Sequence, residues 1–149
     1  MFLLTTKKLF RWSLVVIWLA LTVYLSSQQG TESGELSRKI AAASYTVFGK
    51  LFPGTSLSEY HAALREVAHF TIHFILAALA YRAFAISSGG FRTGIVISLL
   101  FCLLVATMDE FIQCSSPGRS VEFIDFFHNA SGVAFGTLVG ILSSRETVS

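Results

Sequence analysis

The residues in this sequence with the clearest chemical potential are carboxylates that interrupt long apolar runs. Asp109 and Glu110 stand near the end of one apolar run, and Asp125 opens the next. A carboxylate at the bilayer centre costs about 2.5 to 3.5 kcal/mol on insertion scales, and less toward the ends of a span. Because a chain seldom keeps such groups in lipid without pairing or using them, we treat all three as candidate functional residues.

Other polar side chains accompany these acids. Gln113 and Asn129 each follow one of the acids by about one helical turn. Earlier in the chain, Arg65, His69 and His73 recur every four residues, which places them on one stripe of a helix. We expect His73, one turn deeper than His69, to be a neutral and hydrogen-bonded interior residue.

These residue types would support acid–base chemistry on an anionic ligand. His69 is the acid–base candidate, because histidine titrates near neutral pH. Arg119 would bind a phosphate or carboxylate through two parallel hydrogen bonds. The other candidate catalytic groups, serving as general base, metal ligand or orienting group, are Asp109, Glu110 and Asp125. The other candidate binding residues are Arg65, Gln113 and Asn129.

A structural interpretation of the same residues stays open. Arg119 would pair with Asp109 or Asp125, and His69 would bond a carboxylate, so that the polar cluster ties three helices together. Pairing of this kind is how membrane proteins usually tolerate ionisable groups. The two interpretations are compatible with each other.

A metal site is the less favoured interpretation of the sequence. The chain has no His-Glu-x-x-His motif or comparable ligand spacing. In addition, Arg119 would oppose a nearby cation. We therefore predict no metal ligands from the sequence and name no cofactor.

Composition indicates an integral membrane protein. Of 149 residues, 53% are hydrophobic and only 13% are charged, too apolar for a soluble fold. The net charge of +2 is too small to indicate nucleic acid as a partner. Cys102 and Cys114 share one predicted helix, where a rise of about 1.5 Å per residue separates them by roughly 18 Å, so they cannot form a disulfide.

The apolar runs predict an all-α integral membrane protein, a four-transmembrane-helix bundle forming a single membrane domain over 1–149. The predicted spans are about 9–26, 67–86, 94–114 and 123–143. We expect an amphipathic helix at about 36–52, between the first two spans, lying on the membrane or over the mouth of the bundle. Residues 28–35 are polar and contain two glycines, so they predict a loop.

Local motifs support these boundaries. Ser56-x-x-Glu59 is a capping-box pattern that starts the second long helix, and Pro117-Gly118 is typical of a type II turn between the last two. Gly132, Gly136 and Gly140 follow Asn129 at helical spacing. We expect this small-residue face to let another helix approach closely.

The basic residues predict the orientation. On the side of the N-terminus we count six, Lys7, Lys8, Arg11, Arg82, Arg92 and Arg145, and on the other side five, Arg38, Lys39, Lys50, Arg65 and Arg119. The five lie mostly in the longer loop or beside acids. We therefore expect both termini in the cytoplasm. Because the helices alternate in direction, the polar residues should meet at the extracytoplasmic end.

In the order of its motifs, the chain resembles the VanZ-like membrane proteins. The matching elements are Arg65, Ala68-His69-Phe70, Asp109-Glu110-x-x-Gln113, Pro117-Gly118-Arg119, Asp125, Asn129, Gly132 and Gly136. The chain departs from the family pattern at Glu66, where a second basic residue is common, and at Ile72-His73, where an acid–tyrosine pair is common.

The resemblance implies a multi-pass protein of the bacterial cytoplasmic (inner) membrane, linked to the cell envelope and to resistance to the glycopeptide teicoplanin. It implies no settled molecular activity, and the polar residues leave two classes of function open. One is an enzyme, a hydrolase or transferase acting on an envelope lipid or cell-wall precursor in the outer leaflet. The other is a non-catalytic protein that binds such a ligand or assists another envelope protein.

Overall fold

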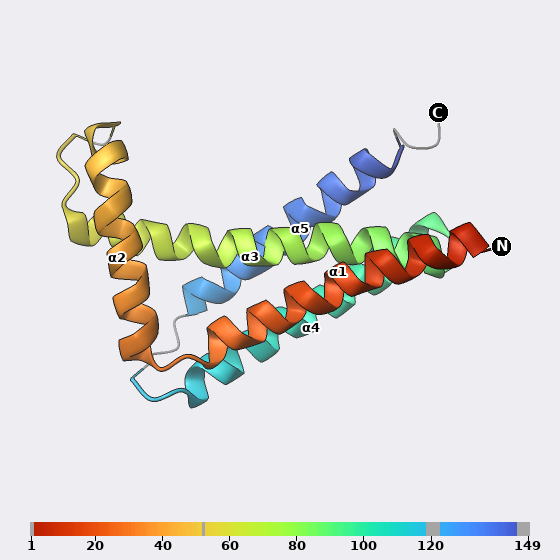
Figure 1. The fold of residues 1–149 in the computed structure, drawn as a ribbon, viewed down its shortest axis with the longest axis horizontal. Coiled ribbons are helices and arrows are strands. Elements are labelled where there is room, and N and C mark those ends of the chain that lie inside the picture. Colours follow the sequence, from red (N-terminus) through yellow and green to blue (C-terminus); the bar gives the residue numbers. More distant parts are fainter. Residues whose placement is uncertain (1, 52, 119–122, 146–149) are drawn as a thin grey trace.

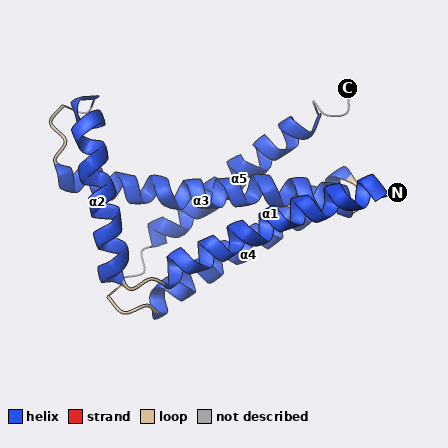
Figure 2. Cartoon of the chain, viewed as in Figure 1, coloured by secondary structure: helices blue, strands red, loops and turns tan. Residues whose placement is uncertain are grey.

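The structure, a computed structural model, describes residues 2–51, 53–118 and 123–145. The α-helices of these residues are α1 (Phe2–Ser27), α2 (Gly30–Phe48), α3 (Leu57–Ser87), α4 (Phe91–Ser115) and α5 (Phe123–Arg145), with a short 3-10 helix η1 (Gly49–Leu51) after α2. Figure 2 shows that this part of the chain contains no strand. The predicted all-α fold is confirmed.

Four of the helices, α1, α3, α4 and α5, are long and apolar enough to cross a membrane. This confirms the predicted four-span bundle. The α3 helix has 31 residues, and a rise of 1.5 Å per residue gives it a length of about 47 Å. Since the hydrocarbon core of a bilayer is about 30 Å thick, the polar first turns of α3 extend beyond it.

The helix α3 is the centre of the bundle, because α1, α2, α4 and α5 all contact it. Figure 1 shows α1, α3 and α4 running along one another, while α5 crosses α3 obliquely. The helix α2 lies across the end of the bundle where α1 ends and α3 begins. The start of α1 and the end of α5 lie at the opposite end, as four alternating spans require.

Small side chains make up much of the buried core. Ala77, Ala80 and Ala83 of α3 are fully buried, together with Val15 of α1 and Cys102 of α4. In lipid, helices gain little free energy from burying apolar surface against each other. Close van der Waals packing between small residues stabilises their association instead. The alanines therefore allow the backbones of the spans to approach.

The glycine face of α5 packs directly against the backbone of α3. A Cβ atom at Gly132 or Gly136 would overlap the carbonyl oxygen of Phe70 or Phe74 respectively. At Gly140, a Cβ atom would lie 2.9 Å from a ring carbon of Tyr81. The predicted small-residue interface is confirmed, and its partner is α3.

The predicted capping box of α3 is also confirmed. The hydroxyl of Ser56 accepts a hydrogen bond from the backbone N–H of Glu59 at 3.3 Å, and the backbone N–H of Ser56 donates to Glu59 Oε2 at 2.8 Å. These bonds form the capping box of α3. After α4, Gly118 has a φ of +77°, the value that a type II turn needs after Pro117.

The loop predicted for residues 28–35 is wrong, because α2 already begins at Gly30. The backbone N–H of Gly30 donates to the carbonyl of Pro117 at 3.0 Å. This long-range bond holds the start of α2 beside the turn that follows α4. Because α1 ends at Ser27, the connection between α1 and α2 has only two residues. The helix also ends earlier than predicted, at Phe48, and η1 takes its place.

Candidate functional site

The polar residues of α3, α4 and α5 meet at the α2 end of the bundle, around Asn129. This side chain is fully buried. Its Oδ1 atom lies 3.2 Å from His69 Nδ1 on α3, and its Nδ2 donates to Glu110 Oε1 on α4 at 2.7 Å. One amide of α5 therefore connects α3 and α4 through His69 and Glu110.

This arrangement fixes the proton on His69. Because the amide nitrogen of Asn129 donates to Glu110, the oxygen of Asn129 faces His69 Nδ1 and can only accept. A neutral His69 therefore carries its proton on Nδ1 and presents the lone pair of Nε2. That nitrogen lies 3.8 Å from Asp125 Oδ2 on the first turn of α5. His69 is thus oriented to accept a proton or to bind a cation through Nε2.

A second set of contacts surrounds Asp109, which is 5% exposed. Ser26 of α1 donates a hydrogen bond to Asp109 Oδ1, and Gln113 Nε2 donates to Asp109 Oδ2 at 2.8 Å. His73 Nε2 of α3 lies 3.5 Å from Asp109 Oδ2. All four spans therefore contribute to the polar cluster.

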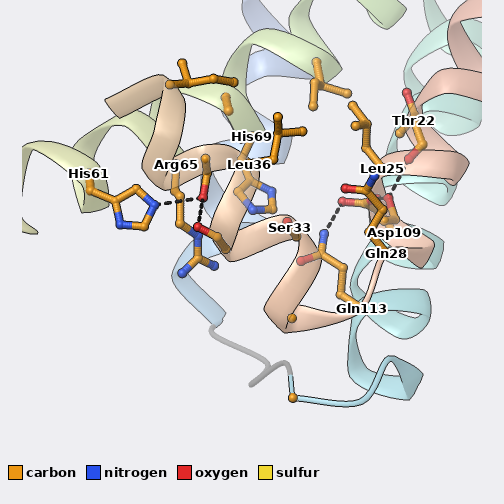
Figure 3. Close-up of a pocket in the computed structure, with 18 of the residues that line it drawn as sticks. Thr22, Leu25, Gln28, Ser33, Leu36, His61, Arg65, His69, Asp109 and Gln113 are labelled. Carbon is orange, nitrogen blue, oxygen red and sulfur yellow. Dashed lines mark hydrogen bonds between the residues drawn. The ribbon is translucent and has the colours of Figure 1, made fainter. Parts of the chain in front are cut away.

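A pocket of about 300 Å³ opens above these residues. Figure 3 shows Asp109 and Gln113 on one side of it, with His69, Arg65 and His61 toward the other. This volume is at the lower end of the range for small-molecule sites. The pocket is therefore large enough for a small ligand group to reach the carboxylate of Asp109 and the imidazoles of His69 and His73.

The helix α2 forms an outer wall of this pocket. Ser33 and Ser37 line it, and the Ser37 hydroxyl lies 2.8 Å from His61 Nε2. Farther along α2, Ala41 is buried against the bundle, whereas Val47 is exposed. The helix was predicted to lie on the membrane or over the bundle mouth, and in the structure it covers the mouth.

The chain matches the VanZ/LLP1 family over residues 10–144. It belongs to this family. No curated protein and no solved structure matches it. The match confirms the resemblance that the motifs indicated, and it begins within α1 and ends in the last turn of α5.

In this VanZ/LLP1 protein, the structure brings together most of the residues that the sequence singled out. The network of contacts contains His69, Asp109, Glu110, Gln113, Asp125 and Asn129. Arg65 is exposed and lines the pocket. Arg119 lies outside the described residues, so its predicted role as a ligand-binding or clasping residue stays a prediction.

Sequence reasoning missed the contribution of α1. Thr22 and Ser26 are both buried, and the Ser26 hydroxyl bonds Asp109 and also the carbonyl of Thr22. The available signal was their spacing of four residues near the end of an apolar run. His73 was expected to be a hydrogen-bonded interior residue. It is buried, but within the described part of the chain neither ring nitrogen makes a hydrogen bond of good geometry.

Proposed function

We propose that the pocket binds a phosphate- or carboxylate-bearing lipid or cell-wall precursor. The observation that carries this proposal is the arrangement around the pocket. Arg65 and His61 can hold an anion at its mouth, while the buried network of His69 and Asp109 forms its inner wall. This arrangement suits a ligand whose anionic headgroup binds at Arg65 and His61 and whose reacting part extends toward the imidazole of His69.

The faces of α2 support a ligand at the level of lipid headgroups. Its Val47 and Phe48 are exposed and do not line the pocket, whereas Leu36 and Ile40 line it together with Ser33 and Ser37. An amphipathic helix of this kind lies in the membrane interface with its apolar face in the acyl boundary. The pocket beneath α2 would then open where phosphate and carboxylate groups of lipids reside.

The side of the membrane follows from the basic residues. Lys7, Arg11 and Arg92 lie at the end of the bundle opposite α2, and basic residues concentrate on the cytoplasmic side. We therefore place both termini in the cytoplasm and the pocket in the outer leaflet of the bacterial inner membrane. A role in teicoplanin resistance rests on the family name and is part of this proposal.

For an enzyme, the geometry supports hydrolysis or transfer at a phosphate. Arg65 would hold the phosphate through its guanidinium. His69 Nε2, freed by the bond from Nδ1 to Asn129, would take the proton of the attacking hydroxyl group or water. Asp125, 3.8 Å away, would stabilise the resulting imidazolium. As the phosphorus–oxygen bond to the leaving group breaks, the imidazolium would return the proton to the leaving oxygen.

The contacts of Asp109 favour the alternative, a non-catalytic protein in which the cluster is a structural clasp. Asp109 accepts bonds from Ser26 and Gln113 and lies beside His73. A carboxylate so well satisfied joins α1, α3 and α4 whether or not a ligand binds.

Binding measurements on the purified protein in nanodiscs test the proposal. The probes are a polyprenyl-phosphate-linked cell-wall precursor and a neutral diacylglycerol. We expect saturable binding of the anionic probe only, weakened at least tenfold by Arg65→Gln. The exposed Arg92 lies at the other end of the bundle, so Arg92→Gln serves as the matched control and should bind normally.

The same system separates the two classes of function. An enzyme with His69→Gln should bind the precursor but fail to release its product. A binding protein should release no product even as the wild type. Equal binding of the anionic and neutral probes, or an Arg65→Gln variant that binds normally, would contradict the proposed site.

A further inference from the structure

We infer that the polar cluster is a binding site for one divalent first-row transition-metal ion, held by His69, His73, Asp109 and Glu110. This inference deepens the proposed function and rests on it for the role of the ion, although not for the binding of the ion. With the ion bound, His69 would be a ligand, and the ion would activate the attacking water in its place. An ion at this position would face the pocket and attract the phosphate or carboxylate of a ligand that enters past Arg65.

The first observation is the distance between the donor atoms. One side-chain nitrogen of His69 and one oxygen each of Asp109 and Glu110 all lie within 4.8 Å of one another. The ligands of a tetrahedral Zn²⁺ ion are about 3.4 Å apart, since each is roughly 2.1 Å from the metal. Small rotations of the side chains therefore suffice to bring the three donors onto one ion.

The second observation concerns His73 and is independent of the first. Its side chain is 1% exposed, and within the described part of the chain neither ring nitrogen makes a hydrogen bond of good geometry. Nevertheless, Nε2 lies 3.5 Å from Asp109 Oδ2. Burying an imidazole without a hydrogen-bond partner is unfavourable. A metal ion bound beside Asp109 would satisfy that nitrogen.

The hydrogen bond of His69 has the form that metal-binding histidines usually show. A ligating imidazole donates its other N–H to an oxygen, and this outer contact fixes both the tautomer and the orientation of the ring. In this protein, Asn129 Oδ1 takes that role toward His69 Nδ1 at 3.2 Å. Asn129 also bonds Glu110 at 2.7 Å, so a single amide orients two of the proposed ligands.

The donor set determines the class of ion. Two imidazoles with two carboxylates match Zn²⁺, Mn²⁺ or Fe²⁺, whereas Mg²⁺ and Ca²⁺ prefer oxygen ligands. The sequence argued against a metal because no linear ligand motif is present. The fold removes that objection, since the ligands come from α3 and α4 at one end of the bundle. The other objection concerned Arg119, which lies outside the described residues.

Equilibrium dialysis of the purified protein in detergent, first stripped with a chelator, tests the inference without any substrate. We expect one Zn²⁺ or Mn²⁺ per chain, and weaker binding of Mg²⁺. Removal of one ligand should reduce the affinity at least tenfold, so we expect this loss in His69→Gln and in the isosteric Glu110→Gln. His128 pairs with Glu66 at 3.9 Å, which makes His128→Gln a matched control that should bind normally.

A measurement on the unaltered protein avoids the question of whether a variant folds. The chain contains four histidines. In protein labelled with ¹⁵N-histidine, Zn²⁺ should move the ring-nitrogen resonances of two of them. Absence of stoichiometric binding, unchanged histidine resonances, or equal affinity in His69→Gln and the wild type would each overturn the metal site. Precursor binding that persists after chelation would then leave the proposed function standing.

Discussion

The Oδ1 atom of Asn129 lies 3.2 Å from His69 Nδ1, so that α5 and α3 meet through an amide and an imidazole. Because Asn129 also donates to Glu110 at 2.7 Å, its two polar ends have different partners. This places the proton of His69 on Nδ1 and makes Nε2 available for chemistry. The orientation of the proposed site therefore depends on Asn129.

Replacing Asn129 by alanine should destabilise the protein and weaken ligand binding. The change removes two hydrogen bonds and leaves His69 Nδ1 and the Glu110 carboxylate without this partner. The loss of a hydrogen-bond partner by a buried polar group costs about 1 to 3 kcal/mol. Thermal unfolding in detergent measures the loss. Ser131 is exposed on the same helix, and Ser131→Ala should unfold as the wild type; equal melting of both variants would contradict the role of Asn129.

Much of this arrangement could be predicted from the sequence. The helical period brought Asp125 and Asn129 onto one face of α5, and the alternation of spans placed that face at the level of His69. The burial of Asp109 rather than Glu110 could not be predicted. The two are neighbours in sequence, and only the rotation of α4 about its axis decides which one faces the interior.

Gly136→Ala should already destabilise the bundle, and Gly136→Leu should do so more strongly. A Cβ atom at this position would overlap the carbonyl oxygen of Phe74, so α5 has to move away from α3. Overpacking of a close interface costs about 1 to 3 kcal/mol. The displacement would also carry Asn129 away from His69.

Thermal unfolding and zinc or precursor binding report the effect of both glycine variants. Ala134 lies on the same helix but is exposed, so Ala134→Leu is the matched control and should change neither property. A Gly136→Leu variant with the melting temperature and binding of the wild type would show that this face is not a tight interface.

Ser26→Ala should lower the stability of the protein by about 1 kcal/mol, because it removes a buried hydrogen bond to Asp109. The neighbouring Ser27 is exposed and bonds only the carbonyl of Tyr24 among the described contacts. Chemical or thermal unfolding of Ser26→Ala and Ser27→Ala in the same detergent measures the difference. Equal stability would exclude α1 from the polar cluster.

The contributions of α1 and α2 were the part that the sequence did not reveal. Serine and threonine in a transmembrane helix commonly bond the carbonyl four residues earlier, as Thr22 and Ser26 do, so they do not indicate a site by themselves. The start of α2 depends on the bond between Gly30 and Pro117. Such a long-range contact has no local signal.

The proposed orientation predicts which cysteines an impermeant thiol reagent can reach. In a Cys114→Ser background, Ser58→Cys lies at the α2 end of the bundle and Ser88→Cys lies at the other end. In intact spheroplasts, the reagent should label the cysteine at position 58 only. Labelling at position 88 alone would invert the orientation and place the pocket in the cytoplasmic leaflet.

The most direct test of the proposed function is photo-crosslinking from the wall of the pocket in living cells. A photoreactive amino acid at Ser33 faces the pocket, and one at Ala42 is exposed on the same helix but does not line it. Mass spectrometry of the purified adducts identifies what occupies each position. We expect position 33 to capture a phosphate- or carboxylate-bearing lipid or cell-wall precursor that position 42 does not capture. Capture of the same bulk phospholipids at both positions would contradict a ligand site beneath α2.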